Sequence, residues 1–377
     1  MTVLEAPPID HAPRVASARI DDFAVPTGRE EEWRFAPVSE LAWFMEPDPA
    51  AGALSARETA HVSVVGPADL EPTSWLPTDR PSVIAMAGVT SAVQVRIADE
   101  EIVDEPIVVD LTGSSERCYG LVDVRSGHHS RATVVLVHDA SVDVSGVILT
   151  VAGVDSDLTV VSVLDGPATR THLWQWHTDV ERDARFVGAL ATLGGRIVRM
   201  MPSVSYTGPG ASADLLGAFL AEDDQYLEHR IFVEHVLPHC RSNVVYKGAL
   251  SGEGAHTVWI GDVLVRPSAT GTDTYEMNRN LLLNDGPRAD SVPNLELETG
   301  DIVSAGHASA TGRFDDEQLF YLQSRGIPEH AARQLVVRGF FVDVLARIPS
   351  PEWRTRMLGR IGNRLGMEAV SEAGDDE

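Results

Sequence analysis

The sequence predicts a mainly β protein, and among β architectures it favours a solenoid. Short Val-rich runs punctuated by Gly, Asp, Ser and Pro recur between about residues 80 and 310, and this pattern is typical of strands separated by turns. Helical periodicity is hard to find in that stretch. A single unit with so many short strands fits a solenoid better than a sandwich or a barrel, although no crisp sequence repeat marks it.

The first 79 residues form a Pro-, Ala- and acid-rich region in which we expect short helices. The segment 27–34 follows Pro26 and has the composition of a short helix start. Residues 39–44 predict a second helical segment, and strong strand patterns are absent until about residue 62. We therefore expect an N-terminal helical region over residues 1–79, ahead of the strands.

Residues 80–310 are expected to form the β core. Turn formers bound each of its Val-rich runs, which is the chemistry of strands and tight turns. The runs with the strongest strand character are 133–137, 142–149, 158–164, 185–190, 197–206, 225–233, 243–250 and 257–265.

Residues 311–377 return to helical patterns and are expected to form a C-terminal helical domain. Asp315 is the expected N-cap of a first helix, with Gln318 at its third position. A second helix is expected from about Pro328, and a third from Pro351 at its first position. Two sets of apolar residues recur at helical spacing: Val336, Phe340, Val344 and Ile348, then Trp353, Met357 and Ile361.

The composition excludes several classes of function. The formal net charge is −26, so nucleic acid and anionic membranes are poor partners for this surface. The only lysine, Lys247, lies in the segment VYKGA rather than in a P-loop, so the chain cannot be a P-loop ATPase by itself. The N-terminus has no leader-like pattern and no run approaches 18 apolar residues, which predicts a cytoplasmic protein.

Metal-binding patterns are weak when the residues are considered alone. Cys118 and Cys240 are too few for a disulfide framework or a four-thiolate cluster site. A group formed by His229, His235, His239 and Cys240 has no clear zinc spacing. We interpret these histidines, and the pair at 128–129, as ordinary surface or turn residues.

Several segments in the C-terminal half stand out as motifs: 242–248 (SNVVYKG), 278–283 (NRNLLL), 293–297 (PNLEL), 306–308 (GHA) and 315–327 (DDEQLFYLQSRGI). Together they resemble motifs of the SufB/SufD family of iron–sulfur cluster assembly proteins. These matches cover roughly residues 235–348. Segment 26–35 (PTGREEEWRF) is similar to the entry motif of SufD proteins, which favours the SufD branch over SufB.

The resemblance implies a right-handed parallel β-helix flanked by N-terminal and C-terminal α-helical regions. It also implies a non-catalytic scaffold subunit of the SufB–SufC–SufD complex, which pairs with a SufB-like protein and docks a SufC-type ABC ATPase. The missing P-loop and the scarcity of thiols fit this role, because ATP hydrolysis and most cluster ligands would come from partners.

His307 is the candidate metal ligand that the resemblance points to, at the interface with SufB. Small residues surround it, which leaves the imidazole accessible. The family often has a Cys shortly before this His, whereas Val303-Ser304-Ala305-Gly306 contains none. We therefore expect a transient iron–sulfur cluster, or iron, to be shared with SufB cysteines. Cys118 and Cys240 are expected to be structural, and flavin binding stays open.

The expected partner-binding residues lie in the C-terminal helices. They are Asp315, Glu317, Gln318, Leu319, Phe320, Tyr321, Arg325, Val336 and Phe340. Two alternatives stay open: a carbohydrate-active enzyme on a β-helix, and a SufB-like scaffold that acts as a homodimer. The enzyme would need a cluster of charged residues on one solenoid face, and the scarcity of Cys argues against a SufB-like chain. A homodimer of the chain when it is alone also stays open.

Overall fold

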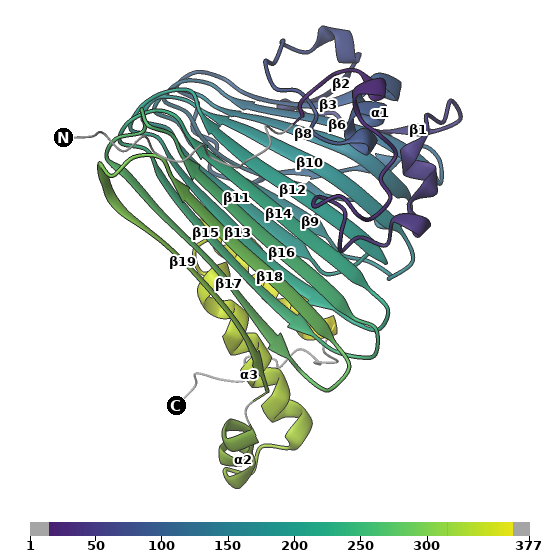
Figure 1. Cartoon of the computed structure of the whole chain (residues 1–377), viewed down its shortest axis with the longest axis vertical. Helices are drawn as coiled ribbons and strands as arrows, with labels where there is room; N and C mark the ends of the chain where they lie inside the picture. The colour runs from purple at the N-terminus through teal and green to yellow at the C-terminus, as the bar shows by residue number, and fades with distance from the viewer. Residues whose placement is uncertain (1–14, 315, 365–377) are drawn as a thin grey trace, which may run out of the picture.

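The computed structural model describes residues 15–314 and 316–364, and these form a parallel β-solenoid with helices on its outer faces (Figure 1). Successive strands alternate between two sheets, which confirms the predicted mainly β, parallel β-helix architecture. The strands of the first sheet's main ladder are β6 (Arg117–Ser126), β8 (Asp143–Ala152), β10 (Thr171–Val180), β12 (Ile197–Tyr206), β14 (Tyr226–His235), β16 (His256–Val265) and β18 (Arg288–Leu297).

The second sheet lies opposite the first and has eight strands. In ladder order they are β4 (Ile107–Asp110), β7 (Arg131–Val137), β9 (Asp157–Leu164), β11 (Arg185–Thr192), β13 (Ser212–Ala221), β15 (Arg241–Leu250), β17 (Thr272–Leu282) and β19 (Ile302–Arg313). All of these pairs are parallel. A parallel ladder of this kind needs a full turn of chain between paired strands, and the intervening strand of the other sheet supplies it.

Residues 15–113, the N-terminal region of the structure, lie at the end of the solenoid opposite β18 and β19 (Figure 1). Its strands β1 (Gly52–Ser55), β2 (Val62–Val65), β3 (Ala92–Ile97) and β5 (Thr112–Gly113) extend the first sheet. Its helical elements are α1 (Arg80–Gly88) and four 3-10 helices: η1 (Ile20–Asp22), η2 (Val38–Glu40), η3 (Ala42–Met45) and η4 (Pro67–Asp69). The Asp79 side chain caps α1 by accepting from the Ser82 N–H.

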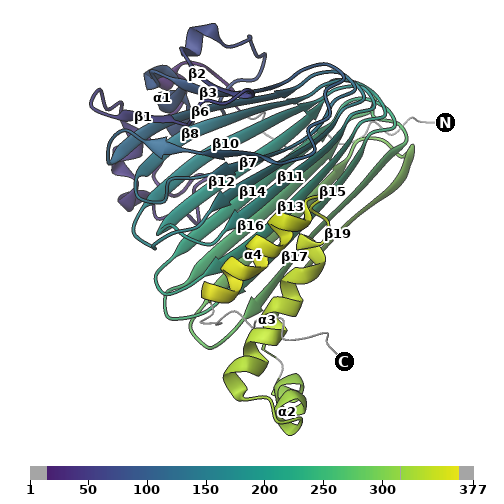
Figure 2. The same cartoon turned by 180° about the vertical axis from the view of Figure 1, so that it is seen from behind.

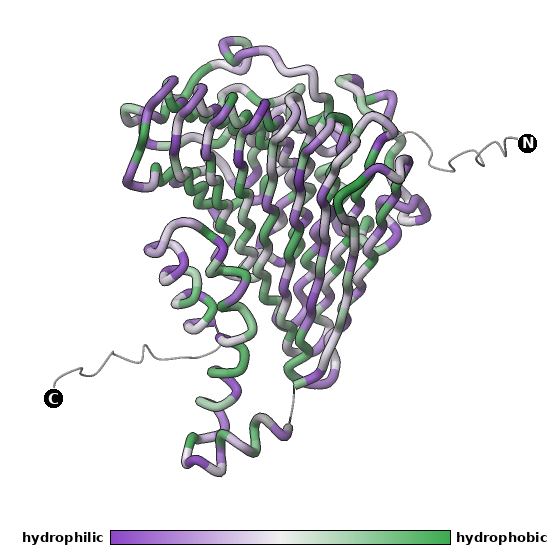
Figure 3. Tube along the Cα trace, turned by 90° about the vertical axis from the view of Figure 1, so that its left-hand side faces the viewer, coloured by the Kyte–Doolittle hydropathy of each residue, from purple (hydrophilic) through white to green (hydrophobic). Residues whose placement is uncertain are grey.

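Side chains alternate between the solenoid interior and its outer faces, and Figure 3 shows hydrophilic and hydrophobic positions alternating along the strands. Valine, leucine and aromatic residues of both sheets fill the interior. Trp174 and Trp176 of β10 are both buried there. The β-branched residues that predicted the strands therefore pack one turn of the solenoid upon the next.

The outer face of the first sheet is covered by the N-terminal region. Trp33, Leu41 and Phe44 pack against apolar residues of the strands. Arg199 of β12 is buried beneath them, and it forms ion pairs at 3.1 Å with both Asp79 and Glu228. Segment 26–35 thus anchors the N-terminal region to this sheet, through the packing of Trp33 and the hydrogen bond from Arg199 to the Glu32 carbonyl.

Two helices cover the outer face of the second sheet (Figure 2). They are α3 (Glu329–Leu345) and α4 (Pro351–Arg364), and α2 (Asp316–Ser324) protrudes beyond the sheet. Trp353, Met357 and Ile361 of α4 are buried together against the strands, as their spacing predicts. The described helices include no span long and apolar enough to cross a membrane.

Several local predictions differ from the structure. Segment 27–34 forms turns rather than a helix, whereas the helical segment expected at 39–44 is present as the 3-10 helices η2 and η3, with Leu41 between them. β1 begins at Gly52, ten residues before the first expected strand. α1 occupies the start of the expected β core, and β19 continues to Arg313. The predicted N-cap Asp315 lies outside the described residues.

Candidate functional site: the open end of the solenoid

The last turn of the solenoid leaves two strand edges open. Within residues 15–314 and 316–364, β18 pairs only with β16, and β19 pairs only with β17. Each of these final strands therefore presents a row of backbone N–H and C=O groups without a strand partner. Such edges are templates for pairing with another chain.

His307 lies in the middle of the open edge strand β19. Its register partner in β17 is Glu276, and its Nδ1 atom lies 3.9 Å from Glu276 Oε1. The His307 side chain is 47% exposed, whereas that of Glu276 is fully buried. The imidazole thus lies at the boundary between the solenoid interior and solvent, where a ligand from another chain can reach it.

Glu276 is an unusual residue for a solenoid interior. Both of its carboxylate oxygens are buried, and among the described residues neither has a hydrogen-bond partner of normal geometry. Burial, and after it the nearby charge of Asp262, raise the pKa of Glu276 to about 8, against the opposite effect of the nearby Asn294 backbone N–H. On the opposite sheet, Gly261 makes room for the group, because a Cβ at that position would lie 2.2 Å from Glu276 Oε2.

The side chains that line the solenoid interior change from apolar to polar along the ladder from β13 to the open end at β19. The first inward column runs through Leu215, Val244, Glu276 and His307, which are successive register partners in β13, β15, β17 and β19. The next columns run through Gly217, Tyr246, Asn278 and Ser309, and through Phe219, Gly248, Asn280 and Thr311. The last two turns therefore line the end of the solenoid with hydrogen-bonding groups.

The cysteines lie away from this end and are sequestered. Cys118 and Cys240 are both fully buried in the main core. Burial raises the pKa of the Cys240 thiol, which makes it a poor thiolate ligand. Among the described residues, no group of three or more His, Cys, Asp or Glu is placed to hold a metal ion.

The interpretation of two histidines as surface residues is wrong. His229 and His235 point into the solenoid and are buried, and burial lowers their pKa to about 3 and about 4. Each pairs one ring nitrogen with a hydroxyl, His229 with Thr192 and His235 with Ser242. His128 and His129 do lie in a turn, as expected, and so does His239.

The predicted partner-binding residues of α2 divide into two groups. Phe320 and Tyr321 are 72% and 56% exposed, and Glu317 and Arg325 are exposed as well. Leu319 is buried. Asp315 lies outside the described residues, and the side chain of Gln318 is likewise outside the description. Two adjacent exposed aromatic residues on a protruding helix are typical of a docking surface.

The predicted face of α3 is used inside the protein. The sequence predicts Val336 and Phe340 as partner-binding residues, but Phe340 packs beside the buried Val344 against the second sheet, and Val336 is only half-buried. The exposed apolar residues of this helix are Leu335 and Val342. Helical spacing alone cannot show whether an apolar face binds a partner or packs inside the protein. Here the apolar face of α3 packs on the outer face of the second sheet.

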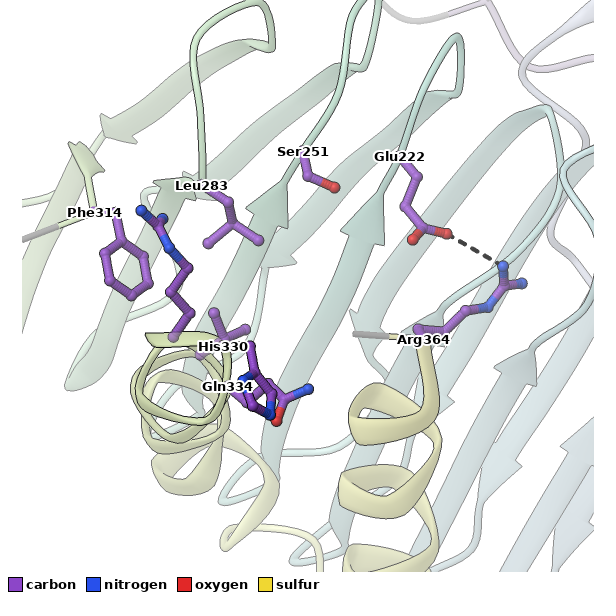
Figure 4. A pocket seen from close by; sticks show the side chains of 9 residues that line it. Glu222, Ser251, Leu283, Phe314, His330, Gln334 and Arg364 are labelled. Carbon is purple, nitrogen blue, oxygen red and sulfur yellow. Dashed lines mark hydrogen bonds and ion pairs between the residues drawn. The ribbon is translucent and has the colours of Figure 1, made fainter. Parts of the chain in front are cut away.

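A cavity of about 330 Å³ lies where α3 and α4 meet the ends of the strands (Figure 4). Arg364 crosses it to Glu222, with an Nη1 to Oε2 distance of 3.3 Å. The Arg333 guanidinium lies 4.9 Å from the ring centre of Phe314 on the other side. The remaining lining residues are Ser251, Leu283, His330, Gln334 and Val337.

The fold and the open end define a class: parallel β-solenoid proteins with a helical unit packed on one face and two free strand edges at one end. Residues 110–340 match the family model described as SUF system FeS cluster assembly, SufBD core domain. The chain belongs to this SufBD family of iron–sulfur cluster assembly proteins.

Relatives of this chain carry corresponding names. It is 44% identical over 371 residues to the iron–sulfur cluster assembly SufBD family protein Rv1462 of Mycobacterium tuberculosis, covering 95% of this chain and 94% of the relative. It is 43% identical over 364 residues to the SufBD family protein ML0594 of Mycobacterium leprae, covering 93% of each. The iron–sulfur cluster assembly protein SufD of Escherichia coli is 31% identical over 173 residues, or 46% of this chain and 40% of the relative.

Proposed function

We propose that this chain is a SufD-type, non-catalytic scaffold subunit for iron–sulfur cluster assembly. In this proposal it pairs with a SufB-like protein through the open end of the solenoid and docks a SufC-type ABC ATPase through its C-terminal helices. The single observation that carries the proposal is the open end itself, where the unpaired edges of β18 and β19 flank an accessible His307.

The exposed side chains of the open end support pairing with another chain. Val303 is 72% exposed, and Leu297 and Tyr275 are also exposed apolar residues of the last turns. A partner strand that continues either sheet would satisfy the edge backbone and cover these side chains together. The resemblance to SufD supports a SufB-like partner for this surface.

The position of Lys247, the only lysine of the chain, supports the proposal that a separate subunit hydrolyses ATP. Lys247 contacts α3 rather than any nucleotide-binding loop. The exposed aromatic residues Phe320 and Tyr321 on the protruding helix α2 offer a compact docking site. Aromatic anchors of this kind dominate the free energy of many protein interfaces.

His307 is the proposed point of contact with iron or a nascent cluster, which is the cargo of the assembly. Imidazole is a suitable ligand for iron. Because both thiols of this chain are buried elsewhere, the sulfur ligands would come from the SufB-like partner. Membership of the SufBD family argues against the alternative of a carbohydrate-active enzyme.

The test is co-expression of the full-length chain, tagged, with a SufB-like protein and a SufC-type ATPase from the same genome. We expect the three proteins to co-purify and to elute together in size-exclusion chromatography. A chain that stays a homodimer in the presence of both partners would overturn the SufD-type proposal and favour the homodimeric, SufB-like scaffold.

A further inference from the structure

We propose that Glu276 and His307 together form a two-donor site for ferrous iron at the open end of the solenoid. The Glu276 carboxylate takes the place of the thiolate that the chain lacks there, so the site receives single Fe²⁺ ions rather than a cluster held by cysteine. This inference rests on the proposed scaffold function, because two protein donors leave the remaining coordination positions to the partner.

The first support is the isolation of Glu276. A buried polar group without a hydrogen-bond partner is unfavourable, because nothing replaces the hydration that it loses on burial. Buried polar groups without hydrogen-bond partners are rare in native proteins, so each one needs a structural or functional reason. Both oxygens of Glu276 are buried, and within the described part of the chain the contact with His307, at 3.9 Å, is too long for a hydrogen bond. Asp290, by contrast, lies 2.7 Å from His256.

The second support is the geometry. Glu276 and His307 are direct neighbours across the parallel ladder, with Nδ1 and Oε1 3.9 Å apart. Donors bound tetrahedrally to one metal at about 2.1 Å lie about 3.4 Å apart. Closing the pair around an ion therefore needs a movement of about half an ångström, which a side-chain rotation supplies.

The third support is the space prepared for the carboxylate. Gly261 lies opposite Glu276, and any Cβ at that position would collide with Oε2. The preceding residues in the same inward column, Leu215 and Val244, are apolar and buried. Only in the last two turns does the column change to an acid and an imidazole, so the two donors are confined to the end that faces a partner.

The donor set selects the class of ligand. Thiolates select iron–sulfur clusters, whereas a combination of imidazole and carboxylate with open positions is typical of mononuclear Fe²⁺ sites. The pair carries one donor nitrogen and one carboxyl group, which releases its proton to solvent as the ion binds. The half-exposed imidazole marks the side from which the ion arrives.

The experiment uses the co-purified complex, stripped of metal and titrated anaerobically with Fe²⁺ alone. The variants are Glu276→Gln, His307→Ala and the double variant. Asp273→Asn is the matched control, because Asp273 lies on the same strand with its carboxylate turned toward Arg241 at 3.5 Å. We expect each single variant to weaken Fe²⁺ binding about tenfold or more. The double variant should lose little beyond either single one, and the control should bind as the wild type.

The outcomes separate the two proposals. If the complex assembles but Glu276→Gln binds Fe²⁺ like the wild type, Glu276 is no ligand and the scaffold function stands. If the wild-type chain forms no complex, the proposed function fails first. X-ray absorption at the iron edge of the wild-type complex needs no variant, and a coordination shell of sulfur alone would overturn the inference even if a variant failed to fold.

Discussion

Lys247 of β15 joins the solenoid to helix α3 by donating to the Asp343 carboxylate at 2.5 Å and to the Phe340 carbonyl at 2.8 Å. It is the only lysine in the chain. Its side chain is almost fully buried, whereas that of Asp343 is largely exposed. A buried ammonium needs its partners, so this contact fixes α3 to the second sheet at one point.

We predict that Lys247→Met loosens the C-terminal helices without unfolding the solenoid. Methionine keeps the volume and the apolar packing of the stem but removes the hydrogen bonds of the ammonium to the Phe340 carbonyl and the Asp343 carboxylate. The expected cost is about 1–3 kcal/mol of local stability. Hydrogen exchange should show faster exchange in α3 and unchanged exchange in β10 and β12. Arg338→Met, on the exposed side of the same helix, is the control, and equal effects of the two variants would contradict the prediction.

The ATPase should dock on the aromatic residues of α2. Phe320→Ala with Tyr321→Ala removes two exposed rings that make no part of the core. We expect at least about 2 kcal/mol loss of binding free energy, or roughly thirtyfold in Kd, because aromatic anchors dominate such interfaces. Isothermal titration with the SufC-type protein measures it.

The control for this docking prediction is Ile102→Ala. Ile102 is an equally exposed apolar residue near the other end of the solenoid, and its replacement should leave Kd and the melting temperature unchanged. Wild-type affinity in the α2 double variant would exclude this helix as the docking site. Point variants are sharper here than removal of the helices, which would also uncover the apolar outer face of the second sheet.

Strand positions were largely predictable because each strand is a β-branched run between turn formers. The expected strand 197–206 coincides with β12, and the expected helix face of Trp353, Met357 and Ile361 is buried as a unit. The sequence shows no crisp repeat because the number of residues in one solenoid turn changes along the chain. The register advances by 26 residues from Cys118 to Val144 but by 32 from Thr257 to Ala289, so no fixed period exists.

The candidate site was only half predictable. A family motif pointed to His307, but nothing local marks Glu276, whose importance depends on β17, β19 and Gly261 meeting in space. The same holds for His229 and His235, which look like surface residues in a strand of mixed polarity. Their burial depends on which side of β14 faces inward, and the even spacing of the two histidines carried that signal in the sequence.

The open edge of β18 should be required for pairing with the SufB-like protein. The Glu298 N–H donates to the Val265 carbonyl of β16, so by alternation the N–H and C=O of Leu297 point away from β16 toward the free edge. Leu297→Pro removes one outward donor and should weaken the heterodimer by about 1 kcal/mol, or roughly fivefold.

Glu298→Pro is the matched control for this edge, because it breaks an internal ladder bond instead. It should lower the melting temperature of the isolated chain, whereas Leu297→Pro should leave it nearly unchanged. Analytical ultracentrifugation of each variant with the SufB-like protein measures the pairing. Wild-type affinity of the Leu297→Pro variant would place the interface on another surface.

The buried histidines predict a steep loss of stability in acid. Burial lowers the pKa of His138 and His235 to about 4, and that of His172 and His229 to about 3. The unfolded chain binds these protons near the ordinary histidine pKa of about 6.5. Stability is therefore fully present above pH ~6.5 and falls as the pH drops, until the folded-state values are reached.

The four sites together give a slope of up to about 5.5 kcal/mol per pH unit between pH ~6.5 and ~4, since each proton contributes about 1.4 kcal/mol per unit. Melting temperatures measured from pH 7.5 to 4.5 at constant ionic strength should fall accordingly. His172→Leu tests the cause, because among the residues that the structure describes neither ring nitrogen of His172 has a hydrogen-bond partner to lose. It should reduce the slope by about a quarter, whereas His128→Gln in an exposed turn should not change it. A slope that His172→Leu leaves intact would place the acid sensitivity in other groups.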